Sequence, residues 1–273
     1  GSDASRIVTA ERIARRYDLH AINADLLASR GFQPGARLKR FLEPSIDKEL
    51  GDPLKLKNVE KAFAVTVEAL QKGQNITVFH DFDVDGITAA VQEYLLLTTM
   101  RDAMGSKSKI EVVASRRMSG GYGVKPEVAR EACEKGAGLL ITLDMGTQQG
   151  ALLRELEKKY GVKTIVKDHH TPGKDDVAPP LMMNPRQKGE KIKYRDISAG
   201  GLMYVQKRAC EKLLKDLHKP WATKAARALK ALEPDFVSFA TLSSVADVMP
   251  LTGFNRALVR SGLVFMTQMA ATP

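Results

Sequence analysis

The sequence predicts an α/β fold in which a parallel β-sheet is flanked by helices, with a helical N-terminal segment and a helical C-terminal part. From residue 76 onward, short β-rich runs alternate with helical stretches, which is typical of βαβ units. Residues 1 to about 70 instead show apolar residues at helical spacing, and the residues after about 197 return to that spacing. We therefore expect a helical segment over residues 1–70 and an α/β domain over residues 71–273.

The elements of the α/β domain follow from apolar runs bounded by turn residues. Four strands are expected, at residues 76–79, 110–114, 139–143 and 163–166. The helices between them are expected at residues 88–102, 125–136 and 148–160. Gly136 and Gly161 are suited to end the last two of these helices. The polar stretch that follows predicts a loop, a short strand at its Leu-Met-Met and a second loop. The later helices are expected at residues 199–217, 222–232, 235–247 and 254–266.

Composition narrows the class of protein. Hydrophobic residues make up 44% and charged residues 27% of the 273 residues, which excludes disordered, collagen-like and coiled-coil chains. No apolar run approaches the about 18 residues that cross a bilayer, so no membrane association is expected. The two cysteines, Cys133 and Cys210, form neither a disulfide framework nor a zinc-binding spacing, which predicts a reducing cytoplasm.

The charge balance favours a polyanionic partner. Forty-two Lys and Arg against 32 Asp and Glu leave a net charge of +10. Nucleic acid is therefore the leading partner class, and a basic surface without a specific partner is the alternative.

Three carboxylates follow the first strand at alternate positions. Asp81, Asp83 and Asp85 precede Gly86, and their mutual repulsion requires a divalent cation or several basic partners. The alternative is a cluster that caps a helix starting near Thr88, although one Asp would suffice for that.

The pattern of Asp81, Asp83 and Asp85 also matches the first half of an EF-hand loop. Gln92 stands where that loop needs a Glu, and a strand precedes the segment, so we do not favour an EF-hand.

Two further strands end in possible metal ligands. Asp144 follows the third strand, and Asp168, His169 and His170 follow the fourth. Because the carboxyl ends of parallel strands share one edge of a sheet, we expect these residues to converge with the Asp81–Asp85 cluster. Oxygen ligands with one or two imidazoles suit Mn²⁺ or Mg²⁺. Two ions about 4 Å apart, bridged by a carboxylate, can hold a phosphate and activate a water, and Asp144 is the candidate bridge.

The ordered set of motifs resembles the DHH phosphoesterase superfamily and, within it, the RecJ-like single-strand-specific 5′-to-3′ exonucleases. The resemblance covers about residues 20–268. It runs through HDFDVDGITAA, SRRMSGGYGVKPEV, ITLDMGTQQG, KDHHTPG, MNPRQKGEKIKYRDISAGG and SSVADVMPLTGFNRALVRSGL. His80 stands where the family usually has Gly, and Met145 stands where a polar residue is common. Neither departure removes a ligand.

The resemblance implies a role for each site residue. The expected metal ligands are Asp83, Asp85, Asp144, His169 and Asp247, with Asp81 beside them as a direct or indirect ligand. His170 is expected to touch the scissile phosphate, and Asp168 to orient a histidine. Asp247 is found only through the resemblance, because a helix-capping Asp would look the same.

Two segments are candidate phosphate-binding sites. Arg116 and Arg117 lie beside a glycine loop that includes Gly121, and Arg117 aligns with the family's Arg before Gly-Tyr-Gly. Ser198 and Gly200 open a helix whose N–H groups could receive another phosphate. The alternative for this second segment is an ordinary Ser cap with glycines that allow close helix packing.

The resemblance implies hydrolysis of phosphodiester bonds in single-stranded nucleic acid, DNA rather than RNA, from a 5′ end, with roles in DNA repair and recombination. RecJ-like enzymes continue into a DHH-associated domain and often an OB fold, which are expected to be absent here. A separate second domain or replication and repair proteins are therefore expected partners. The alternatives are a phosphodiesterase for short oligonucleotides or cyclic dinucleotides and a non-catalytic scaffold, although every ligand position is intact.

Overall fold

The computed structural model describes residues 3–115 and 123–271 and contains a five-stranded parallel sheet with the strand order β2-β1-β3-β4-β5. The strands are β1 (Asn75–His80), β2 (Ile110–Ala114), β3 (Ala137–Leu143), β4 (Lys163–Lys167) and β5 (Met182–Met183). The predicted α/β class and all the predicted strands are confirmed. Because the sheet is parallel and its central strands are covered on both faces, nearly all residues of β1, β3 and β4 are buried.

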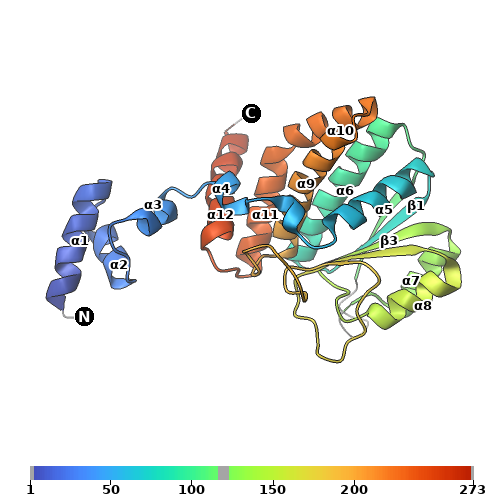
Figure 1. Cartoon of the computed structure of the whole chain (residues 1–273), viewed down its shortest axis with the longest axis horizontal. Coiled ribbons are helices and arrows are strands. Elements are labelled where there is room, and N and C mark those ends of the chain that lie inside the picture. Colours follow the sequence, from blue (N-terminus) through green and yellow to red (C-terminus); the bar gives the residue numbers. More distant parts are fainter. Residues whose placement is uncertain (1–2, 116–122, 272–273) are drawn as a thin grey trace.

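Helices cover both faces of the sheet (Figure 1). Alternate residues of each strand point to opposite faces, so Val78 and Ile141 join one hydrophobic cluster while Phe79 and Leu140 join another. The first cluster is covered by α5 (Val59–Gln71), α6 (Val84–Met104), α9 (Ala199–Asp216), α10 (Pro220–Ala231) and α11 (Glu233–Ala246). The second is covered by α7 (Pro126–Glu134) and α8 (Gly150–Tyr160).

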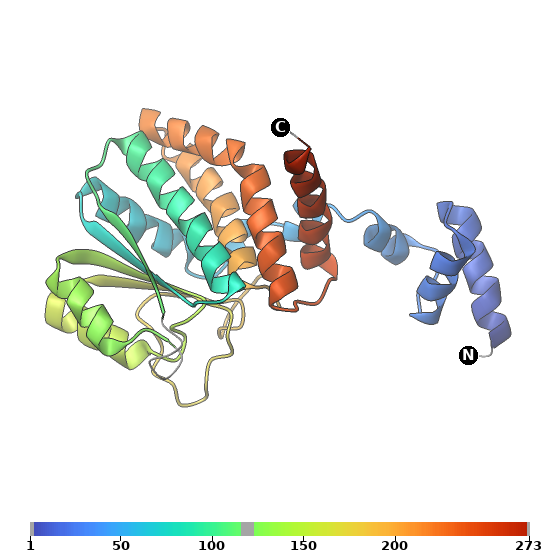
Figure 2. The same cartoon turned by 180° about the vertical axis from the view of Figure 1, so that it is seen from behind.

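The N-terminal helices divide into two groups. The helices α1 (Asp3–Tyr17), α2 (Ala21–Ser29) and α3 (Ala36–Leu42) pack around a small cluster of their own that includes Ile13 and Phe32, and Figure 2 shows them apart from the main body. The next elements, α4 (Ile46–Leu50) and the 3₁₀ helix η1 (Pro53–Lys55), contribute Leu50 and Leu56 to the main core together with α5. The elements from α4 to α5 thus pack with the main core, although they belong to the stretch that the sequence predicts as a helical N-terminal segment.

Most predicted helix limits agree with the structure to within a few residues, and one differs for a clear reason. The helix expected to start near Thr88 begins at Val84, because the Asp83 side chain accepts a hydrogen bond from the Gly86 N–H at 2.9 Å and caps the helix earlier. The last helix, α12 (Gly253–Ala270), packs against α11. Among the described residues, no helix is both long and apolar enough to cross a membrane.

Candidate metal centre

The structure brings the predicted ligands together at the carboxyl edge of the sheet. Asp81 follows β1, Asp144 follows β3 and His169 follows β4, whereas Asp247 comes from the end of α11. Among the described residues, three groups have ligand atoms within 4.8 Å of one another, and some members are shared: Asp144, His169 and His170; Asp85, His169 and Asp247; Asp81, Asp83 and Asp144. The convergence expected from the strand ends is therefore present.

One imidazole nitrogen lies among three carboxylates. His169 Nε2 is 3.1 Å from Asp144 Oδ1, 3.4 Å from Asp85 Oδ2 and 3.6 Å from Asp247 Oδ2. One N–H can satisfy only one of these oxygens, and His169 Nδ1 and Asp247 Oδ2 have no hydrogen-bond partner in the part of the chain that the structure describes. Such a set of close, incompletely bonded ligand atoms fits a bound cation.

Asp144 occupies a constrained position at the middle of the cluster. Its backbone is left-handed, with φ of 59°, and its N–H donates to the Lys167 carbonyl oxygen at 3.0 Å. Burial, together with the neighbouring charges of Asp85 and Asp83, raises the pKa of Asp144 to about 10. The carboxyl group therefore keeps a proton at neutral pH unless a cation compensates the negative charge. Carboxylate oxygens with imidazole nitrogens are the donor set that Mn²⁺ accepts and Mg²⁺ tolerates, so the residues present fit a divalent ion.

Asp85 is held by the N-terminus of α9. The N–H groups of Ala199 and Gly200 each donate to its carboxylate at 2.8 Å, and Ser243 Oγ donates to the same group. These backbone donors are therefore already used, which corrects the expectation that Ser198 and Gly200 form a phosphate site. Ser198 caps the helix by accepting from the Gly201 N–H at 3.1 Å.

Gly200 serves close packing rather than phosphate binding. A Cβ on Gly200 would lie 2.6 Å from the Cβ of Ser243, which leaves no space for a side chain. The alternative interpretation of this segment, a Ser cap followed by packing glycines, is the one that the structure supports. The helix N-terminus instead stabilises the buried charge of Asp85.

The other two carboxylates after β1 have local partners. Asp81 Oδ1 accepts from the Phe82 N–H and from Ser115 Oγ, both at 2.8 Å. Asp83 is exposed and caps α6. Gly86 allows the helix to start this close to the strand, because a Cβ there would lie 2.3 Å from the Asp81 carbonyl oxygen.

Asp168 orients the histidine loop. Its Oδ1 accepts from the His169 N–H at 2.7 Å and from His170 Nδ1 at 2.7 Å, and its Oδ2 accepts from the Thr147 N–H at 3.0 Å. Burial opposes the charged form, but the hydrogen bonds from His170 and Thr147 outweigh it and lower the pKa of Asp168 to about 2. The same hydrogen bond raises the pKa of His170. The His170 side chain, held at Nδ1 by Asp168, is 44% exposed and so can approach an external group.

Asp247 ends α11 as its C-terminal cap and reaches the cluster from outside the sheet. Burial raises the pKa of Asp247, with smaller contributions from Asp85 and Asp83. Asp247 thus caps a helix and also lies beside His169, so its position is consistent both with a helix cap and with a metal ligand.

Sequence reasoning did not find several supporting residues. Asn184 donates to Thr147 Oγ1 and to the His170 carbonyl oxygen, both at 2.9 Å, and so joins three loops. Lys167, directly before Asp168, forms a fully buried ion pair with Glu93 on α6 at 2.7 Å. A lysine at the end of a buried strand can be noticed in the sequence as an unusual residue. Asn184 and Thr147 have no feature in the sequence, beyond their polarity, that indicates a supporting role. The predicted phosphate-binding residues Arg116, Arg117 and Gly121 lie outside the described residues.

Comparisons with known proteins agree with this geometry. The family model described as "DHH family, N-terminal domain" matches residues 75–229. The single-stranded-DNA-specific exonuclease RecJ of Escherichia coli (strain K12) is 29% identical over 238 residues, which cover 87% of this chain and 39% of that protein. RecJ of Thermus thermophilus is 34% identical over 231 residues, which cover 84% of this chain and 30% of that protein.

A solved structure shares the architecture. The crystal structure of RecJ in complex with Mn²⁺ from Thermus thermophilus has a TM-score of 0.64 and 28% sequence identity, and the match covers 94% of this chain and 33% of that chain. The chain thus spans at most about two fifths of the length of these relatives. Because the family model matches more than half of the residues, the chain belongs to the DHH family, and the relatives it resembles within that family are RecJ exonucleases.

Proposed function

We propose that this chain is a metal-dependent nuclease that hydrolyses phosphodiester bonds in single-stranded DNA from a 5′ end. The observation that carries the proposal is the sharing of Asp144 and His169 between groups of ligand atoms, which gives adjacent places for two cations. The resemblance to single-stranded-DNA-specific exonucleases supports the choice of substrate. The net charge of +10 favours a long polyanion over a small phosphate ester.

In this proposal, one set of side chains holds the cations and another contacts the phosphate. Asp81, Asp83 and Asp144 would hold one cation, and Asp85, His169 and Asp247 would hold the other, with Asp144 beside His169 between the two groups. When bound, Mn²⁺ or Mg²⁺ supplies positive charge at the phosphate and lowers the pKa of the attacking water. His170, whose ring orientation is fixed by Asp168, would contact the scissile phosphate.

The proposal is tested with 5′-labelled single strands, dinucleotides and cyclic dinucleotides, each incubated with the protein and with Mn²⁺, Mg²⁺ or EDTA. We expect labelled mononucleotide from the single strand and no product in EDTA. Hydrolysis restricted to cyclic dinucleotides or dinucleotides would favour a small-substrate phosphodiesterase. A lack of hydrolysis of every substrate, in protein that binds Mn²⁺, would contradict a catalytic role.

A further inference from the structure

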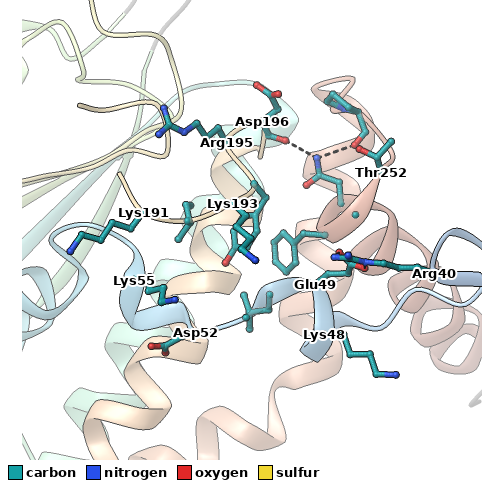
Figure 3. A pocket seen from close by; sticks show the side chains of 18 residues that line it. Arg40, Lys48, Glu49, Asp52, Lys55, Lys191, Lys193, Arg195, Asp196 and Thr252 are labelled. Atoms are coloured by element: carbon teal, nitrogen blue, oxygen red, sulfur yellow. Dashed lines mark hydrogen bonds and ion pairs between the residues drawn. The ribbon is translucent and has the colours of Figure 1, made fainter. Parts of the chain in front are cut away.

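Three adjoining hollows lie on the surface formed by α3, α4, η1, the loop over residues 188–196 and the start of α12. The central hollow, of about 430 Å³, is shown in Figure 3, with Lys55 and Lys191 on one side and Arg40 and Lys48 on the other. A second hollow of about 360 Å³ shares Lys55 and Lys191 with it. A third, of about 680 Å³, shares Arg40 with it. Because neighbouring hollows share walls, they form one continuous surface, here called the basic track.

The basic track carries most of the net charge of the chain. Its walls contain eleven Lys and Arg but only four Asp and Glu, a net charge of +7 against +10 for the whole sequence. The basic residues are Arg30, Arg37, Arg40, Lys48, Lys55, Lys57, Lys61, Lys191, Lys193, Arg195 and Arg256. Such a concentration of one sign on one face attracts a polyanion.

Within the track, Arg40 pairs with Glu49, whereas several of the lysines have no acidic partner among the described residues. Lys48, Lys191 and Lys193 make no ion pair among the described residues. Two of the four acids in the walls pair with cations from outside the track: Asp52 with Lys212 and Asp196 with Arg186, both at 3.0 Å. These outside cations leave the lysines of the track with even less compensation, so bound anions would relieve their repulsion.

The aromatic rings of the track are covered. The guanidinium of Arg37 lies 5.0 Å from the centre of the Phe32 ring, and that of Arg256 lies 3.6 Å from the centre of the Phe41 ring. Tyr194 stacks on Phe254 at 4.4 Å. Stacking of bases on these rings would require displacement of their present neighbours. The track therefore offers contacts to phosphates and none that distinguish bases.

The track is separate from the metal centre but structurally joined to it. None of the proposed metal ligands lines any of the three hollows. Asn255, in the wall, donates to the carbonyl oxygens of Asp196 at 2.7 Å and Pro250 at 3.1 Å. Asp196 shortly precedes the α9 N-terminus that holds Asp85, and Pro250 shortly follows Asp247.

We infer that the basic track binds the sugar–phosphate backbone of a single strand outside the cleavage site, without regard to base sequence. The identity of the polyanion rests on the proposed function, whereas the existence of a polyanion site rests on the charge and the hollows alone. Contacts to a strand beyond the cleaved bond would raise affinity for long substrates and leave dinucleotide hydrolysis unchanged.

The inference is tested by the double variant Lys191→Gln/Lys193→Gln of the full chain. The matched control is Lys224→Gln/Lys230→Gln, which removes two exposed lysines of α10 that line none of the three hollows. Binding of a fluorescent single strand of about 20 nucleotides is measured in EDTA across a salt series, so that no hydrolysis is required. Melting curves verify that both variants are folded.

We expect the double variant to flatten the log–log salt dependence by about 1.4, since each phosphate contact to a single strand contributes about 0.7. The control should keep the wild-type slope, and a strand with abasic sites should bind as tightly as the intact strand. Equal slopes for the double variant and the wild type, or equal changes in both variants, would overturn the inference. Tighter binding of polyglutamate than of the strand would point instead to an acidic protein partner.

The metal-dependent arm separates this inference from the proposed function. With Mn²⁺, the double variant should hydrolyse a dinucleotide at the wild-type rate and a long strand at a reduced kcat/KM. Absence of hydrolysis by the wild type would contradict the nuclease assignment while leaving the binding result in EDTA to decide on the track.

Discussion

Asp144 and His169 show how single residues concentrate the chemistry of the site. Each belongs to two groups of ligand atoms, and each is almost fully enclosed by protein. A buried carboxyl with other carboxylates around it is costly as a charge, and the raised pKa of Asp144 expresses that cost. The absence or presence of a cation should therefore change the behaviour of this residue more than that of any exposed acid.

Replacement of Asp144 by Asn should abolish Mn²⁺-dependent hydrolysis and also remove a pH dependence of stability. In EDTA, the folded-state pKa of Asp144, about 10, lies above the value of about 3.9 for an unfolded chain. Between these two pKa values, Asp144 carries a proton in the folded state but not in the unfolded state. The free energy of unfolding of the wild type therefore falls as the pH rises through this range. Between pH 5 and pH 9 the wild-type Tm should fall more than that of Asp144→Asn, by at least about 2–4 °C.

Thermal melts in EDTA at several pH values measure this difference. Addition of Mn²⁺ at pH 9 should raise the Tm of the wild type and have little effect on the variant. Identical pH profiles of the two proteins would show that Asp144 does not carry the proton.

The two histidines should differ in what their loss affects. His170→Ala removes a partly exposed side chain that Asp168 holds at Nδ1, so turnover should fall by about 10²–10³-fold with a small change in Mn²⁺ affinity. His169→Ala removes the nitrogen that lies among three carboxylates, so this variant should lose more Mn²⁺ affinity than His170→Ala does. Calorimetric Mn²⁺ titrations alongside kcat measurements would reveal equal metal loss in both variants if this division is wrong.

At the level of elements, the site depends on the junction of α6, α9 and α11. The carboxylate of Asp85 on α6 accepts two N–H donors from the start of α9 and a hydroxyl donor from Ser243 on α11. The contacts that pack these three helices together therefore also orient the carboxylate of Asp85. A shift of α9 or α11 would therefore remove hydrogen-bond donors from Asp85, a proposed metal ligand.

Ser243→Ala should weaken Mn²⁺ binding by about 10–100-fold, because a group that orients a ligand is lost while the ligand itself remains. Saturating Mn²⁺ should restore most of the turnover. Ser238→Ala is the matched control on α11, since the buried Ser238 hydroxyl has no hydrogen-bond partner among the described residues. An unchanged Mn²⁺ affinity in Ser243→Ala would remove Ser243 from the positioning role.

Strands and their ends could be predicted from the sequence because their signals are local. An apolar run followed by Asp or His indicated the positions of Asp81, Asp144 and His169 at one sheet edge. Asp247 has no such signal, since it reaches the site from a helix end, and only the resemblance indicated it. The use of the α9 N-terminus by Asp85 could not be predicted from the sequence, because Ala199 and Asp85 lie 114 positions apart in the chain. Contacts of this kind depend on tertiary packing.

At the scale of the whole molecule, α1, α2 and α3 form a unit with a small core of its own. Phe41, at the end of this unit, accepts a hydrogen bond at its carbonyl oxygen from Arg256 of α12 and lies under the same guanidinium. A core this small supplies little stability, so the unit should open locally without unfolding of the main body.

Ile13→Ala should destabilise this unit by about 2–5 kcal/mol, because Ile13 is fully buried in its core. Hydrogen exchange should accelerate over residues 3–42 and stay unchanged in β1 and β3, and dinucleotide hydrolysis should be retained. Ile22→Ala, at a position 72% exposed on α2, should have little effect. Faster exchange in the sheet of Ile13→Ala would show that the two cores unfold together.

The order of the proposed ligands along the chain has a consequence for folding. The ligands run from Asp81 to Asp247 and come together only when β1, β3 and β4 are paired and α11 has docked. Parallel pairing of this kind joins distant segments and is slow. During synthesis, the ion-binding cage cannot close until the ribosome has passed Asp247. Metal capture would thus follow the docking of α11, and a half-folded molecule would hold protons where the folded protein would hold ions.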